Sequence, residues 1–149
     1  MGTQLLFRSP SRPRQGTQQP IVLVVDDDDN IRDLLCMVLA DEHPGYCVLG
    51  ASCGPEALAL VREFGRPCFL LLDYELGSRM NGIDLYDVLH VDLVTERIPA
   101  IMLSGRLPTA ALQERCIPSM SKPFELDALL ADIAGQLAGL AGAVPACAC

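Results

Sequence analysis

The sequence predicts an α/β fold in which helices cover both faces of a parallel β-sheet. Five short apolar runs alternate with five segments of helical character along the chain, which is the pattern of strands joined by crossover helices. The first run, at 21–25, is apolar throughout and rich in β-branched residues, as in a strand that is covered on both faces. A length of 149 residues fits one domain with one well-buried core.

Composition and charge argue against several classes of protein. The formal net charge is −8, and residues 21–149 carry −11 because Arg8, Arg12 and Arg14 precede them without any acid. So acidic a body argues against direct binding to nucleic acid. No apolar run approaches the ~18 residues of a membrane span, and the N-terminus lacks the apolar core of a secretory signal. We therefore expect a cytoplasmic protein that does not bind a membrane.

The two ends of the chain differ in composition from its body. Residues 1–19 are rich in Pro, Arg, Gln and Ser and have little to bury, so we expect disorder there. Residues 20–140 form the predicted domain. Residues 141–149 are rich in Ala and Cys, and we expect them to be a flexible tail rather than an output domain.

The first half of the chain contains two predicted strands and two predicted helices. The strand at 21–25 precedes a helix whose apolar residues recur at i, i+3, i+4, i+7 and i+8, and Pro44 and Gly45 end this helix. These apolar residues are Ile31, Leu34, Leu35, Val38 and Leu39. A second strand at 46–52 and a short helix at 54–65 follow.

The second half continues the alternation. A strand at 67–73 leads through a polar loop into a helix at about 83–94. A fourth strand ends at Ser104 and a brief fifth strand ends at Lys122, with a short helical piece at 109–116 between them. The last helix, at about 125–140, carries Leu126, Leu129, Leu130, Ile133 and Leu137 on one side.

Candidate functional residues follow four of the five predicted strands. Asp26 and Asp27 follow the first strand, Asp73 ends the third, Ser104 the fourth and Lys122 the fifth. The carboxyl ends of strands in an open parallel sheet form its binding crevice, so the fold would bring these side chains together. Bare carboxylates repel one another, but they become ligands when a hard divalent cation such as Mg²⁺ lies among them.

This set of residues points to phosphoryl transfer. Asp73 could be both a metal ligand and a nucleophile, because carboxylates form aspartyl-phosphates. Mg²⁺ and the Lys122 ammonium would supply the positive charge that the phosphoryl oxygens need. The Ser104 hydroxyl can donate a hydrogen bond to one of those oxygens.

Each of these residues also has an ordinary structural explanation. Asp28 and Asp29 fit a helix cap and a first helical turn, and we assign them that role. Taken alone, Ser104 could be a turn residue, Lys122 a surface lysine and Asp73 an acid at the start of a turn. Two histidines, His43 and His90, receive no role.

Seven cysteines in a short chain could suggest a disulfide framework, but their positions do not support one. Cys36 lies in a helix-like pattern, and Cys47 and Cys68 lie in strand-like runs, so we interpret them as small buried apolar residues. Cys147 and Cys149 could bind a metal, but no other cluster of ligands accompanies them.

Four motifs in the same order resemble those of the receiver domain of two-component response regulators. They are VVDDDDNIR, LLLDYEL, IMLSG and SKPF, each at the end of a predicted strand. The resemblance covers about residues 20–140 and is specific because independent matches multiply. It implies the flavodoxin-like (βα)5 fold with the strand order 2-1-3-4-5.

The resemblance also implies a role for each matching residue. Asp73 would accept a phosphoryl group from a histidine kinase or a phosphotransfer protein. Asp26 and Asp27 would hold Mg²⁺, with Asp27 as the direct ligand and the backbone carbonyl of Glu75 as a further one. Lys122 would contact the phosphoryl group.

Further positions match residues around the site. Ser104, followed by Gly105, would turn toward the phosphoryl group, and Pro123 would follow a cis peptide bond. Glu75 and Arg106 match positions that tune hydrolysis of the phosphoryl group. The only enzymatic activities implied are phosphorylation and dephosphorylation of the chain itself.

The chain departs from the family pattern at three places. The loop 74–82 lacks the usual proline and is slightly longer than usual. The segment between Ser104 and Lys122 is several residues shorter, which predicts a short fourth helix. Ser119 occupies a position where the family often has an aromatic residue that swings inward on activation.

The sequence therefore leaves three functional hypotheses open. The first is a single-domain receiver that docks onto a downstream protein, as a monomer or a phospho-dependent homodimer. The second is a haloacid-dehalogenase-like, Mg²⁺-dependent phosphatase with its D-x-D motif at Asp26 and Asp28, which would leave Asp73 without a role. The third is a receiver-fold binding module that works without phosphate.

Overall fold

The computed structural model describes residues 19–77, 79–91, 97–106 and 108–142. Five parallel strands form one sheet in the order β2-β1-β3-β4-β5, which confirms the predicted fold class and strand order. The strands are β1 (Ile21–Val25), β2 (Cys47–Ala51), β3 (Phe69–Asp73), β4 (Ala100–Ser104) and β5 (Ser119–Ser121). The helices are α1 (Asp29–Glu42), α2 (Gly54–Phe64), α3 (Gly82–Leu89), α4 (Thr109–Glu114) and α5 (Leu126–Gly142).

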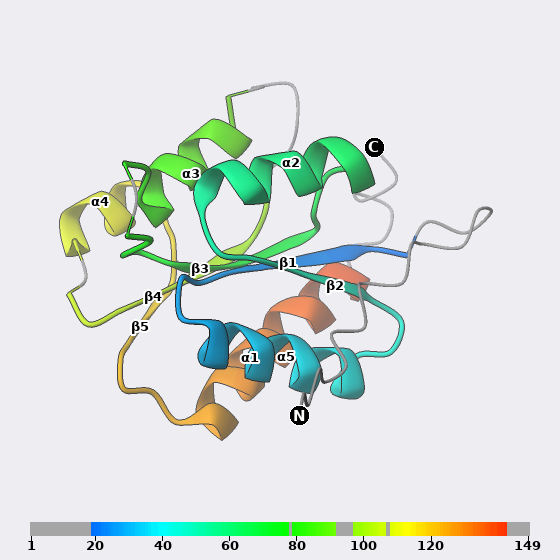
Figure 1. Ribbon diagram of the computed structural model, residues 1–149. Helices are drawn as coiled ribbons and strands as arrows, with labels where there is room; N and C mark the ends of the chain where they lie inside the picture. The colour runs from blue at the N-terminus through cyan, green and yellow to red at the C-terminus, as the bar shows by residue number, and fades with distance from the viewer. Residues whose placement is uncertain (1–18, 78, 92–96, 107, 143–149) are drawn as a thin grey trace, which may run out of the picture.

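The helices cover the sheet on both sides. Figure 1 shows α1 and α5 on one face and α2, α3 and α4 on the other. Successive strand residues point to opposite faces, so each strand contributes to two cores. Leu70 packs in the core beneath α2, α3 and α4, whereas Leu71 packs in the core beneath α1 and α5. This two-sided burial explains why β1 and β3 are apolar at nearly every position.

Two helices begin with caps that hold the loops near the carboxyl edge of the sheet. The Asp28 carboxylate accepts hydrogen bonds from the backbone N–H groups of Asn30 and Ile31, at 2.9 and 3.2 Å. At α3, Asn81 and Asp84 form a reciprocal capping box. The sequence predicted a helix cap at Asp28 or Asp29, and the structure shows that Asp28 is the cap of α1 and Asp29 lies in its first turn.

The third helix is shorter than predicted. The expected helix at 83–94 begins at Gly82 but ends at Leu89, with His90 as its C-cap, and residues 92–96 lie outside the described part. The reason is a tertiary contact, because Nε2 of His90 accepts a hydrogen bond at 2.9 Å from the backbone N–H of Ile98, just before β4. The fourth helix has six residues, as short as the sequence predicts.

The described part of the chain holds five cysteines, none of which forms a disulfide within it. Those at the three positions named in the sequence analysis behave as small apolar residues, whereas Cys116 is exposed. Cys47 is buried, Cys36 and Cys68 are partly buried, and burial raises the pKa of Cys36 to about 11, which keeps this thiol protonated. Cys147 and Cys149 lie outside the described residues, as do the expected disordered segment up to residue 18 and most of the expected tail.

Among the described helices, none combines the length and apolar character that crossing a membrane requires.

Candidate functional site

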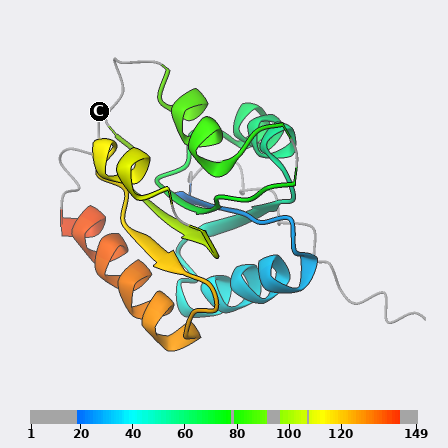
Figure 2. The same ribbon diagram turned by 90° about the vertical axis from the view of Figure 1, so that its left-hand side faces the viewer.

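The carboxyl edge of the sheet carries an unusual set of buried polar groups. Figure 2 looks toward this edge, where the loops after the strands gather. Among the described residues, the buried polar or charged side chains are Asp26, Asp73 and Ser104, at 1%, 4% and 1% exposure. All three end strands or directly follow them. Burying a carboxylate is costly unless a partner compensates its charge, so this edge is a candidate site.

Lys122 provides that compensating charge. Its Nζ atom lies 3.0 Å from Oδ2 of Asp26 and 3.1 Å from Oδ2 of Asp73. Burial alone would lower the pKa of the Lys122 ammonium, but the hydrogen bonds and charges of the two carboxylates raise it instead. Lys122 follows β5, and the peptide bond between Lys122 and Pro123 is cis.

Both acids are held at both of their oxygens. Oδ1 of Asp26 accepts a hydrogen bond from the backbone N–H of Asp28 at 2.9 Å. Oδ1 of Asp73 accepts one from the backbone N–H of Glu75 at 3.1 Å. The remaining oxygen of each carboxylate faces Lys122, so the two side chains have defined orientations.

The surroundings of Asp73 disfavour the ionised form of its carboxyl group. Burial, followed by the negative charge of Asp26, raises the pKa of the Asp73 carboxyl to about 6, although Lys122 and the backbone of Glu75 oppose this rise. The carboxylate is therefore still ionised at neutral pH, but it gains from any additional positive charge nearby.

The geometry of the carboxylates fits a divalent cation. One oxygen from each of Asp26, Asp27 and Asp73 lies within 4.8 Å of the others. Asp27 is exposed, which leaves a side open to the waters that Mg²⁺ retains. Across from it, Gly77 has a left-handed φ of +61°, and a Cβ there would lie 3.1 Å from Oδ2 of Asp27. A hard-oxygen donor set and an open side are what Mg²⁺ requires.

Ser104 lies at the same edge but faces a different partner. Its hydroxyl donates to the backbone carbonyl of Arg106 at 2.9 Å and accepts from the backbone N–H of Arg106 at 3.0 Å. Gly105 and Arg106 are exposed. The structure therefore brings Ser104 to the end of β4, next to β3, with its hydroxyl in the β4–α4 loop.

Two residues near the acids had no role in the sequence interpretation. Gly82 lies so close to Asp73 that a Cβ would overlap the Asp73 carbonyl oxygen, and a glycine at a helix start gives little warning of such contact. Arg32 reaches from α1 to the backbone of Asp26 at 2.9 Å. Its position in the VVDDDDNIR motif pointed to a role near the site. Its hydrogen-bond acceptor could not be predicted, because every residue has a backbone carbonyl.

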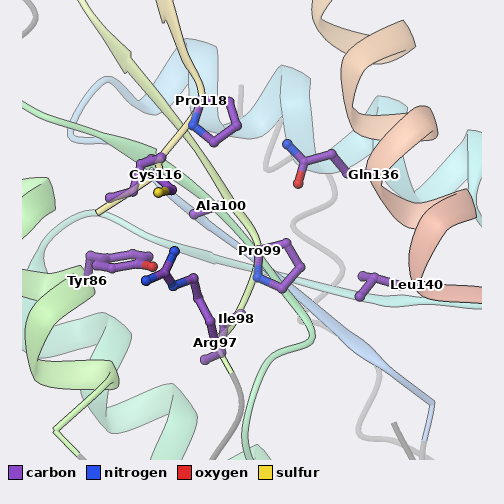
Figure 3. Close-up of a pocket in the computed structure, with 10 residues that line it drawn as sticks. Tyr86, Arg97, Ile98, Pro99, Ala100, Cys116, Pro118, Gln136 and Leu140 are labelled. Atoms are coloured by element: carbon purple, nitrogen blue, oxygen red, sulfur yellow. The ribbon is translucent and has the colours of Figure 1, made fainter. Parts of the chain in front are cut away.

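A separate pocket of about 320 Å³ lies at the opposite edge of the sheet, where β4 and β5 begin (Figure 3). Its lining is mostly apolar, with Arg97 and Gln136 among its polar members. The pocket contains no carboxylate side chain, and none of the predicted site residues contributes to it.

Comparisons with known proteins agree on one family. Residues 22–134 match the sequence profile of the response regulator receiver domain. The nitrogen assimilation regulatory protein NtrX of Azorhizobium caulinodans is 32% identical over 114 residues, which are 73% of this chain and 24% of that protein. The chain thus spans about a quarter of the length of the curated relatives it matches.

Solved structures give the same result. The receiver domain of NtrX from Brucella abortus superposes with a TM-score of 0.64 at 31% identity, covering 77% of this chain and 95% of that one. The chemotaxis protein CheY4 of Vibrio cholerae superposes with a TM-score of 0.66 at 25% identity, covering 77% and 96%.

Proposed function

The chain belongs to the response regulator receiver domains, and from this membership we propose that Asp73 is its phosphoacceptor. The donor would be a histidine kinase or a phosphotransfer protein, and the reaction would require Mg²⁺. The observation that carries the proposal is the buried Asp73 carboxylate, 3.1 Å from the Lys122 ammonium and grouped with Asp26 and Asp27.

The reaction is a displacement at phosphorus. A carboxylate oxygen of Asp73 forms the new P–O bond while the P–N bond of the donor phosphohistidine breaks, and the leaving imidazole takes up a proton. Mg²⁺, held by Asp26, Asp27 and Asp73 with the backbone carbonyl of Glu75, would supply positive charge at the phosphoryl oxygens.

The neighbouring side chains stabilise the product. Lys122 already contacts Asp73 and would move its ammonium to a phosphoryl oxygen as negative charge develops there. Ser104 would exchange its bond to the Arg106 carbonyl for one to the phosphoryl group. Glu75 and Arg106 are exposed beside the site, where they can influence the water that hydrolyses the product.

This exchange by Ser104 would transmit the signal. Releasing the Arg106 carbonyl frees the loop that leads to α4, so phosphorylation would shift the equilibrium between two arrangements of that loop. The surface formed by α4, β5 and α5 would then dock a downstream protein or a second copy of the chain. We place this activity in the cytoplasm, without contact to nucleic acid.

The phosphatase alternative fits the structure poorly. Its D-x-D motif would use Asp28, whose carboxylate caps α1 through two backbone N–H groups. It would also leave Asp73 idle, although Asp73 lies buried against Lys122.

The test is labelling by acetyl phosphate in the presence of Mg²⁺. The native chain should take up one phosphoryl group, and Asp73→Asn should take up none. Asp132→Asn, an exposed acid on α5, serves as a matched control that should label normally. Labelling of Asp73→Asn would refute the assignment of Asp73 as the acceptor.

Two further measurements address the alternatives. Repeated turnover of an external phosphate ester would support the phosphatase, and failure of the native chain to bind beryllofluoride with Mg²⁺ would support a phosphate-independent module.

A further inference from the structure

The structure assigns Arg32 of α1 a positioning role, and we propose that its guanidinium fixes the peptide unit between the metal carboxylates Asp26 and Asp27. This inference rests on the proposed function, because it concerns the same cation site. The inference goes beyond the proposed function because it names a residue that would touch neither the cation nor the phosphoryl group.

The central contact joins a side chain to the backbone. Nη1 of Arg32 donates a hydrogen bond to the carbonyl oxygen of Asp26 at 2.9 Å. That carbonyl belongs to the peptide unit that joins Asp26 to Asp27. Because this unit is planar, fixing its carbonyl oxygen also fixes where the Cα atom of Asp27 lies relative to Asp26, and Asp27 is the exposed member of the carboxylate cluster.

The guanidinium itself is held in place. Nη2 of Arg32 lies 2.6 Å from Oδ1 of Asp29, in the first turn of α1. The Arg32 side chain is only 13% exposed, whereas that of Asp29 is 77% exposed. Two donors of one planar group therefore reach a backbone carbonyl and a surface carboxylate at once, a geometry that an ammonium cannot reproduce.

The aliphatic stem of Arg32 is held as well. It passes over Gly50 of β2, where a Cβ would lie 3.4 Å from both Cγ and Cδ of Arg32. The same Cβ would lie 3.0 Å from Sγ of Cys36. Packing against the sheet thus limits the positions that the guanidinium can reach.

Every other polar group of Asp26 already has a partner. Its backbone N–H donates to the carbonyl of Ala51 at 3.1 Å. Its two carboxylate oxygens accept from Asp28 and Lys122. Arg32 binds the one remaining group, the carbonyl, and so completes the immobilisation of a metal-binding residue before the metal arrives. Partners of this kind contribute substantially to metal affinity in other sites.

Two views of Arg32 predict opposite results. A cation beside the site repels Mg²⁺, so if Arg32 acted only through its charge, its removal would tighten Mg²⁺ binding. If Arg32 acts by positioning, its removal weakens binding. Lysine separates the two further, because it keeps the charge but cannot reach both acceptors.

The experiment is titration of the full chain with MgCl₂ by isothermal calorimetry, without a phosphoryl donor. Arg32→Gln and Arg32→Lys should each weaken Mg²⁺ binding by about tenfold or more. Arg62→Gln is the matched control, since Arg62 is an exposed arginine in the last turn of α2, and it should bind like the native chain. Thermal melting of each metal-free variant reports whether it is folded.

The outcomes separate this inference from the proposed function. A native chain that does not bind Mg²⁺ overturns the proposed function. A native chain that binds, beside Arg32 variants that bind equally or more tightly, overturns the inference alone. Should the variants not fold, ¹⁵N NMR of the native chain decides the matter. Slowly exchanging, separately resolved Nη protons of Arg32 are expected, and a freely rotating guanidinium contradicts the role.

Discussion

Lys122 and Asp73 are 49 residues apart in sequence, yet Nζ of one lies 3.1 Å from Oδ2 of the other. The same ammonium contacts Asp26, so one cation balances two buried acids. In the metal-free protein the site therefore carries one negative charge more than its cation can balance, even before exposed Asp27 is counted. That excess supports the proposal that the site binds a divalent cation, and it predicts that losing Lys122 is costly.

Replacing Lys122 by methionine should destabilise the metal-free protein in a pH-dependent manner. Two buried carboxylates would face each other without a cation, and the free energy of unfolding at pH 8 should fall by about 2 kcal/mol. This is less than for a fully enclosed pair, because 21% of the Lys122 side chain is exposed. The deficit should shrink at pH 5, because the pKa of the Asp73 carboxyl is about 6 and this group then takes up a proton. Urea denaturation with EDTA at both pH values measures it.

A matched control comes from the surface of the same protein. Arg115 forms a two-point ion pair with Asp87, at 2.8 Å for each contact, but 48% of the Asp87 side chain is exposed. Arg115→Met should therefore cost less than about 1 kcal/mol. Equal losses in the two variants, or a loss from Lys122→Met that does not change with pH, would contradict the account of the buried acids.

Asp73 should make the metal-free protein less stable as the pH rises. The pKa of this carboxyl is about 6 in the folded chain and 3.8 in the reference state. Between these values the folded chain binds more protons than the unfolded chain, so the free energy of unfolding falls as the pH rises from about 4 to about 6 and then levels off.

Asp73→Asn should remove this dependence. At pH 8 in EDTA the variant should be more stable than the native chain by about 3 kcal/mol, and at pH 4 most of this difference should disappear. Excess MgCl₂ should restore much of the stability of the native chain but little of the variant's, because ligand binding stabilises the folded state. Denaturation curves at several pH values test this, and a variant that is less stable at pH 8 would disprove it.

The sequence predicted those features that depend on strand ends and periodicity. The residues that close β1, β3, β4 and β5 meet at one edge because parallel strands must place their carboxyl ends together. The distinction between Asp26 and Asp28 also followed from local rules, since the first closes a strand and the second caps a helix.

Features that depend on tertiary contacts to the backbone escaped prediction. The apolar pattern continues beyond Leu89, so periodicity alone extended α3 too far, whereas the stop comes from His90 and Ile98. Arg32 likewise binds a carbonyl, and a carbonyl is present at every residue. The sequence predicted that Ser104 ends a strand, but the direction of its hydroxyl toward Arg106 could be known only from the folded chain.

Ser104→Ala should separate phosphorylation from its structural response. Asp73, Lys122 and the acidic pair remain, so acetyl phosphate should still label the chain. The alanine side chain has no hydroxyl that could exchange its hydrogen bond to the Arg106 carbonyl for one to the phosphoryl group. We expect the NMR shifts that beryllofluoride and Mg²⁺ induce at residues 109–114 in the native chain to be strongly reduced in the variant.

Ser121→Ala is the control for this experiment. Ser121 lies opposite Ser104 in the β4–β5 ladder but is exposed, so its loss should leave the response intact. Ser104→Thr, which retains a hydroxyl, should also respond. A full response from Ser104→Ala would show that the signal reaches α4 by another route.

His90 should exist as the neutral tautomer that carries its proton on Nδ1. Nδ1 lies 2.6 Å from the carbonyl oxygen of Tyr86, which can only accept a hydrogen bond. Nε2 lies 2.9 Å from the backbone N–H of Ile98, which can only donate. The two partners therefore fix the tautomer, and the ring also stacks on Tyr86 at a centroid separation of 4.0 Å. Two-dimensional ¹H–¹⁵N spectra of the imidazole distinguish the tautomers at pH 8.

Replacing His90 by alanine leaves the Ile98 N–H without its acceptor and should lower the free energy of unfolding by about 2 kcal/mol. A ring protonated at Nε2, or an alanine variant as stable as the native chain, would show that the end of α3 is set by something other than this histidine.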